Sequence, residues 1–170
     1  MMTRKKWNKQ LTEQIPHLLR YAKALTRDID MAEDLIQDCL ERAWRKRSLW
    51  DSQRKLRPWL FTIMHNVYIN EISKLVNKHQ HVSVDISMID ERVDDSQILR
   101  ISELDKALGK LDPEYREIVL LAGLEGMSYK EIAAITGLPL GTVMSRLSRA
   151  REKLKKLMDG SEIQKVVRIR

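Results

Sequence analysis

The apolar positions of the N-terminal half recur with the period of α-helices. The first predicted helix places on one face Leu11, Ile15, Leu18, Ala22 and Leu25. After a polar break at residues 26–30, a second apolar stripe runs through residues 32–43, with acidic and amide side chains on the opposite face. Cys39 belongs to this stripe, and we interpret it as a small core residue.

A third helix is predicted from Pro58, because proline suits a first helical turn, where its missing N–H needs no partner. Two apolar stripes follow on this helix, one containing Leu60 and the other Phe61. A helix with two apolar faces is covered by several neighbours. We therefore expect it to be the central helix of a small bundle.

Helical periodicity is lost between residues 77 and 100. The alternation of Val82, Val84 and Ile86 is too short and isolated to predict a sheet. We interpret this segment as a linker. The predicted organisation is an all-α protein of two small helical domains, residues 1–78 and 104–158, joined by an acidic flexible linker at 79–103 and followed by a tail at 159–170.

The C-terminal domain carries clear helix start and stop signals. Asp112 is a predicted N-cap before a first-turn proline, Gly126 predicts a break, and Ser128 with Glu131 predicts a capping box. The final helix, which begins after Pro139, has one apolar face and one strongly basic face.

Residues 129–149 fit a helix-turn-helix. Ala133 is small where two helices must cross, Gly137 lies where the turn needs a positive φ, and Val143 anchors the second helix. That helix would enter the major groove with its N-terminal part. The candidate contacts to bases or phosphates are Thr142, Ser145, Arg146 and Arg149. The alternative is an ordinary helical hairpin with a solvated charged face, and the combination of features favours DNA binding.

The charge distribution supports two polyanion-facing domains. Of the net charge of +7, residues 1–80 contribute +7, residues 81–103 contribute −4, and residues 104–170 contribute +4. Ordinary solvated surface charge is the alternative for the N-terminal block. No apolar run is long enough to span a membrane, and residues 1–10 lack a signal-peptide core, so we expect a cytoplasmic protein.

Few signals point to metal, redox or catalytic chemistry. A single cysteine cannot form an internal disulfide or a multi-thiolate zinc site. His79 and His81 are the only close histidine pair, and we expect no metal site there and no cofactor. The sequence contains no phosphate-cradling glycine loop or nucleophile elbow, so an enzyme is not expected.

Three segments in this order carry a family resemblance: Ala32 to Asp38 (AEDLIQD), Leu56 to Leu60 (LRPWL) with Asn66, and Leu140 to Arg151 (LGTVMSRLSRAR). The sequence resembles bacterial extracytoplasmic-function (ECF) RNA polymerase sigma factors over nearly its whole length. The resemblance implies one helical domain that binds RNA polymerase and the downstream (minus-ten) promoter element. It implies a second domain that binds the upstream (minus-thirty-five) element.

The resemblance assigns site residues to three groups. The segment that docks on the coiled coil of the largest polymerase subunit corresponds to Asp34, Leu35, Gln37 and Asp38. The region that captures the unpaired downstream element corresponds to Trp50, Arg54, Lys55, Arg57, Trp59 and Asn66. The upstream-element helix-turn-helix corresponds to Lys130, Gly141, Thr142, Met144, Ser145, Arg146 and Arg149. The alternative for the acidic group is a solvated helix face.

We expect the tryptophans to differ in how far they are buried. Trp44 and Trp59 lie beside apolar stripes and are expected to be at least partly in the core, whereas we expect Trp50 to be the most exposed. Two positions depart from the family pattern, because arginine or lysine is common where this sequence has His65 and Met144. The acidic linker corresponds to the family connector that threads into the polymerase, and it equally suits a disordered tether.

The predicted function is promoter selection and opening as a dissociable subunit of core RNA polymerase. The expected partners are core polymerase, promoter DNA and an anti-sigma factor. One alternative is a helix-turn-helix regulator that never acts as a polymerase subunit. Another is a sigma-like decoy that binds an anti-sigma protein, although the basic face of the last helix disfavours it.

Overall fold

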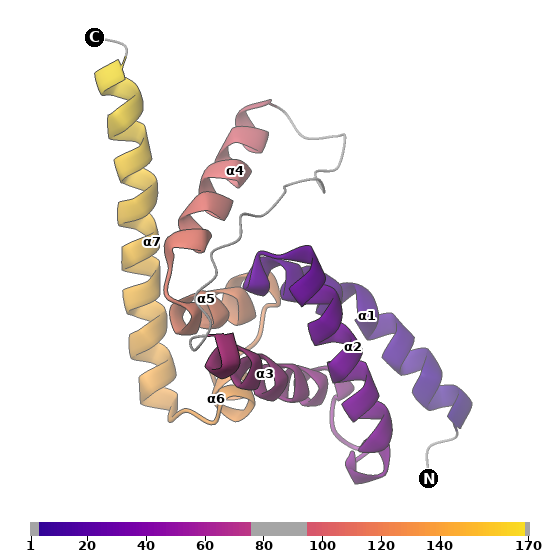
Figure 1. The fold of residues 1–170 in the computed structure, drawn as a ribbon. Coiled ribbons are helices and arrows are strands. Elements are labelled where there is room, and N and C mark those ends of the chain that lie inside the picture. The colour runs from indigo at the N-terminus through magenta and orange to yellow at the C-terminus, as the bar shows by residue number, and fades with distance from the viewer. Residues whose placement is uncertain (1–3, 76–94, 169–170) are drawn as a thin grey trace.

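The structure is a computed structural model that describes residues 4–75 and 95–168 (Figure 1). Every regular element within these ranges is helical, which confirms the all-α prediction. The elements are α1 (Arg4–Thr26), α2 (Ile29–Arg45), the 3-10 turn η1 (Arg47–Leu49), α3 (Leu56–Leu75), α4 (Asp95–Lys110), α5 (Pro113–Val119), the π-helical turn η2 (Leu120–Leu124), α6 (Tyr129–Thr136) and α7 (Leu140–Arg168). None of the helices in these ranges combines the length and the apolar character that a bilayer crossing requires.

Helices α1, α2 and α3 form the N-terminal bundle. Helix α2 begins with the Asp28 carboxylate as its N-cap, which accepts a hydrogen bond of 2.9 Å from the Met31 N–H. Helix α3 buries both of its predicted stripes, with Leu60 and Phe61 almost completely covered. It packs against α2, α1 and α6, so the prediction that several neighbours cover this helix is confirmed.

The C-terminal half contains the predicted helix-turn-helix in α6 and α7. Ser128 and Glu131 form the predicted capping box, and Gly137 adopts a left-handed φ of 71° at the end of α6. Gly126, with φ 63°, ends the preceding segment as predicted. Asp112 occupies the N-cap position of α5 without a side-chain cap bond, because its carboxylate instead accepts a 2.9 Å bond from Lys153 on α7.

Two differences from the predicted elements concern the middle of the chain. Helix α4 begins at Asp95, so the predicted linker at 79–103 extends too far into it. Between α5 and α6 the chain winds as a π-helix, with the Glu125 N–H bonded to the Leu120 carbonyl at 3.1 Å. The histidine pair and the Val82–Ile86 alternation lie outside the described residues.

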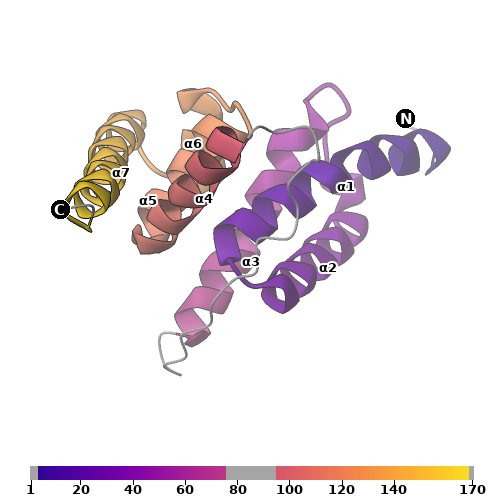
Figure 2. The same cartoon turned by 90° about the horizontal axis from the view of Figure 1, so that it is seen from above.

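The two halves of the chain pack against each other, which the sequence does not predict. Figure 2 shows the C-terminal helices beside the N-terminal bundle. Helix α3 contacts α6, and α1 contacts α5 and η2. Buried hydrophobic side chains of both halves belong to one continuous core cluster. The structure is therefore a closed arrangement of the two halves.

Candidate functional site

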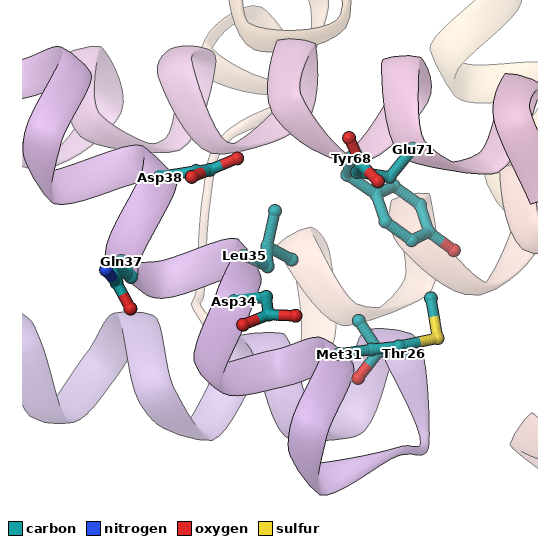
Figure 3. Close-up of a pocket in the computed structure, with 8 residues that line it drawn as sticks. All are labelled: Thr26, Met31, Asp34, Leu35, Gln37, Asp38, Tyr68 and Glu71. Atoms are coloured by element: carbon teal, nitrogen blue, oxygen red, sulfur yellow. The ribbon is translucent and has the colours of Figure 1, made fainter.

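An acidic pocket of about 450 Å³ lies between α2 and α3 (Figure 3). Its lining residues are Thr26, Met31, Asp34, Leu35, Gln37, Asp38, Tyr68 and Glu71. All four residues assigned to polymerase docking line it. Asp34 and Gln37 are exposed, whereas Leu35 is buried and contributes to the apolar wall. The pocket therefore offers carboxylates around an apolar patch.

The α3 side of the pocket adds residues that the sequence analysis missed. Glu71 supplies a further carboxylate and is paired with Lys74 at 2.7 Å. Burial raises the pKa of the Tyr68 hydroxyl above its ordinary value, an effect that Arg116 partly offsets, so this hydroxyl is neutral and can donate a hydrogen bond. No sequence signal links α3 to α2, because the two segments become neighbours only when the bundle forms.

The tryptophans of the predicted strand-capture region lie in an aromatic cluster. Trp50 is only 9% exposed, and its ring centroid is 5.4 Å from that of Trp7, which also contacts Trp59 at 5.9 Å. The expectation that Trp50 is the most exposed is wrong, because Trp7 of α1 covers it. The expectation for Trp44 and Trp59 is confirmed, since both are partly buried against the core.

The polar residues of the predicted strand-capture region are exposed to solvent, except for Arg57. Arg54, Lys55 and Asn66 are exposed on the loop and on α3. Arg57 instead forms a salt bridge with Glu125 of the C-terminal half. His65 is also engaged, because its Nδ1 lies 2.6 Å from the carboxylate of the buried Glu117. A histidine at this position thus contacts the C-terminal half.

The first turns of α7 present the predicted DNA-binding face. Met144 is 52% exposed, and Ser145 and Arg149 are also exposed, while Val143 and Leu147 are buried beneath them. Lys130 and Gly141 are exposed as well, and Thr142 is half-buried. Arg146 forms a 3.0 Å salt bridge with Glu114, an exposed residue of α5. This alternation of buried and exposed positions leaves one face of the first turns of α7 open to solvent.

Comparison with known proteins agrees with this arrangement. Residues 101–154 match the family model of sigma-70 region 4, and residues 11–65 match that of the sigma2 domain of PhyR. The ECF RNA polymerase sigma factor EcfG of Rhodopseudomonas palustris is 33% identical over 151 residues, which cover 87% of this chain and 83% of EcfG. The chain belongs to the ECF RNA polymerase sigma factors.

Further similarities support the assignment to the ECF sigma factors. SigL of Mycobacterium tuberculosis, strain H37Rv, is 34% identical over 139 residues, which cover 78% of this chain and 77% of SigL. The sigma factor RpoE of Bartonella quintana, solved in complex with the anti-sigma factor NepR, has a TM-score of 0.79 and 34% identity, with 91% of this chain and 98% of RpoE covered.

Membership of this family settles the class of function. An ECF sigma factor is a non-enzymatic transcription initiation factor of RNA polymerase. A regulator built on the helix-turn-helix alone would not explain the match of the N-terminal bundle. The similarity to sigma factors over most of the chain likewise disfavours a decoy without promoter binding.

Proposed function

We propose that this sigma factor docks on core RNA polymerase through the acidic pocket between α2 and α3. The observation that carries the proposal is that Asp34, Gln37 and Asp38 line one pocket together with Glu71 of α3. Carboxylates accept short, bidentate hydrogen bonds from arginine, so such a pocket suits a basic helix of the partner. Leu35 and Met31 supply apolar contact beside these charges.

We also propose how the promoter is divided between the two halves. Arg54, Lys55 and Asn66 contact the unpaired downstream element, and the exposed face of α7 with Lys130 contacts the upstream element. Trp50 and Trp59 support the strand-capture loop from within the aromatic cluster. We propose two functional units, residues 1–78 and a C-terminal unit that ends at residue 158 and begins with α4 at Asp95 rather than at residue 104.

The relatives support proposals for regulation and location. Because Bartonella quintana RpoE was crystallised with the anti-sigma factor NepR, we propose that an anti-sigma factor also binds this chain. Its site of action is the cytoplasm, where core polymerase and promoter DNA are found.

The docking surface is tested by the double substitution Asp34→Ala/Gln37→Ala. Both side chains are exposed, so the variant keeps its helical content and its thermal midpoint within a few degrees, yet loses binding to core polymerase. The matched control is Glu33→Ala, which removes an exposed carboxylate of the same helix that does not line the pocket. Normal holoenzyme assembly by the double variant, measured by gel shift or size exclusion, would show that docking occurs elsewhere.

A further inference from the structure

Glu125, the residue directly after η2, is charged, and its side chain is completely buried. Its Oε1 atom accepts hydrogen bonds from Arg20 at 3.1 Å and 3.4 Å, and its Oε2 atom pairs with Arg57. His17 Nδ1 lies 3.8 Å from Oε2. All three partners belong to the N-terminal bundle, so one carboxylate of the C-terminal half lies among two arginines and a histidine of the N-terminal half.

These three partners of Glu125 come from two helices that pack together. His17 and Arg20 are three residues apart and therefore share a face of α1, while Arg57 lies in the first turn of α3. The arginines also donate to backbone carbonyls, Arg57 to that of Glu125 at 3.0 Å and Arg20 to that of Leu124 at 3.2 Å. A buried carboxylate without such donors would be strongly unfavourable, so these arginines stabilise the charge of Glu125.

Arg57 lies one residue beyond the exposed loop that carries Arg54 and Lys55, after the buried Leu56 that begins α3. The planar guanidinium group of arginine can form two parallel N–H···O hydrogen bonds with either a carboxylate or a phosphate. If an unpaired strand runs along this loop, its phosphates would reach the position that Glu125 occupies in the closed chain. Arg20, half-exposed on α1, converges on that same position.

We propose that Arg20 and Arg57 form a binding site for a backbone phosphate of the unpaired promoter strand, and that Glu125 occupies this site while the free chain is closed. The proposal rests on the strand-capture role proposed above for the loop and α3. Closure of the two halves and binding of the strand then exclude each other. Glu125 acts as an internal competitor that must leave before the promoter strand enters.

A second set of contacts, distant in sequence from Glu125, supports closure as a defined state. Arg27 donates to both carboxylate oxygens of Asp105 on α4, at 2.7 Å and 2.9 Å. Its backbone is left-handed, with φ 58°, and such strain persists only where the surrounding structure imposes it. Gly109 provides the space, because a Cβ atom there would lie 2.7 Å from the Arg27 Nε.

The first measurement follows closure in the full-length free chain. Spin labels on Glu33→Cys of α2 and Arg151→Cys of α7, both exposed positions, report the distance between the halves, while the buried Cys39 stays unlabelled. Glu125→Gln keeps the size of the side chain and removes its charge, and we expect it to populate longer distances. Glu152→Gln is the matched control, since it removes a carboxylate of the same half that is 65% exposed. An unchanged distance distribution for Glu125→Gln overturns the proposal.

The second measurement follows binding of a labelled single-stranded DNA of mixed sequence, because phosphate contacts do not depend on sequence. Glu125→Gln should raise the affinity at least about fivefold, the lower end of typical coupling between sites. In this opened background, adding Arg20→Gln should reduce the slope of log affinity against log salt by about 0.7, the value for one phosphate contact to a single strand.

Adding Arg57→Gln to Glu125→Gln instead distinguishes failure of the two-arginine phosphate site from failure of the strand-capture role on which it rests. If Arg57→Gln lowers the salt slope and Arg20→Gln does not, the strand-capture region stands and the two-arginine site is wrong. If neither arginine changes the slope, the placement of the strand beside Arg57 is itself wrong. Circular dichroism of each variant confirms that the helices remain formed.

Discussion

Replacement of Trp50 by alanine separates a structural role of its indole from a stacking role on DNA. The ring is 9% exposed and lies 5.4 Å from the ring of Trp7. Truncating a core tryptophan to alanine costs about 3–5 kcal/mol, to which an aromatic pair adds about 0.5–1.5 kcal/mol. Neither indole N–H has a hydrogen-bond partner among the described residues, and such an unpaired donor already costs about 1–3 kcal/mol. We therefore expect a net loss of about 3 kcal/mol in the free energy of unfolding.

Urea denaturation followed by circular dichroism measures this loss. Trp50→Phe keeps an aromatic ring and removes the unpaired N–H, so its stability should stay within about 1 kcal/mol of the wild type. Leu49→Ala, at a neighbouring position that is 76% exposed, should stay within about 0.5 kcal/mol. In transcription, Trp50→Ala should be equally impaired on a duplex promoter and on one with a pre-opened bubble. If it is as stable as the wild type and defective only on the duplex, Trp50 stacks on DNA and the structural reasoning fails.

Three further predictions concern other parts of the chain. Asn66 is exposed, so Asn66→Ala should leave the free energy of unfolding unchanged. It should impair transcription from a duplex promoter more than from a pre-opened one, since the bubble removes part of the unstacking cost. Equal transcription defects on the two templates would argue against strand capture. Arg149→Ala should remove about 1–3 kcal/mol of base discrimination in the upstream element, whereas Lys155→Ala, farther along α7, should weaken binding to all sequences alike. Binding to a randomised upstream-element library at two salt concentrations separates the two effects. If Arg149→Ala keeps the wild-type sequence preference, this residue does not contact the bases. Burial raises the pKa of the Cys39 thiol from 9.0 to about 12, so its stabilising contribution is full below pH 9 and is lost as the pH rises toward 12. The stability difference between wild type and Cys39→Ala should therefore fall by up to about 1.4 kcal/mol per pH unit above pH 10 in urea titrations, and a difference that does not vary with pH would mean that the thiol ionises freely in the folded state.

The elements that sequence predicts well are those fixed by local interactions. The capping box of Ser128 and Glu131 and the left-handed Gly137 depend only on residues within one turn, and both occur as predicted. The burial of α3 likewise follows from its own two stripes. The start of α4 at Asp95 was not predicted, because the apolar residues of its first six positions are the adjacent pair Ile98 and Leu99, and helical spacing resumes only at Ile101.

The features that sequence could not predict depend on pairs of residues far apart in the chain. The burial of Trp50 requires Trp7, and nothing in the spacing of these two residues indicates that their rings meet. Glu125 and Arg57 each look like ordinary surface charges until the two halves close. The acidic pocket was predicted only on its α2 side for the same reason, since Tyr68 and Glu71 arrive from another helix.

The π-helical turn η2 makes the position of Glu125 depend on chain length as well as on residue identity. A π turn holds one residue more than an α-helical turn, and Glu125 follows directly on Leu120–Leu124. Deletion of one residue here would restore α-helical winding and rotate the following chain by about 100° relative to α5. Glu125 would then point away from Arg20 and Arg57, although all three charged residues would still be present. Related proteins can thus gain or lose this contact through a single-codon insertion or deletion, a change that a comparison of the charged positions alone would not detect.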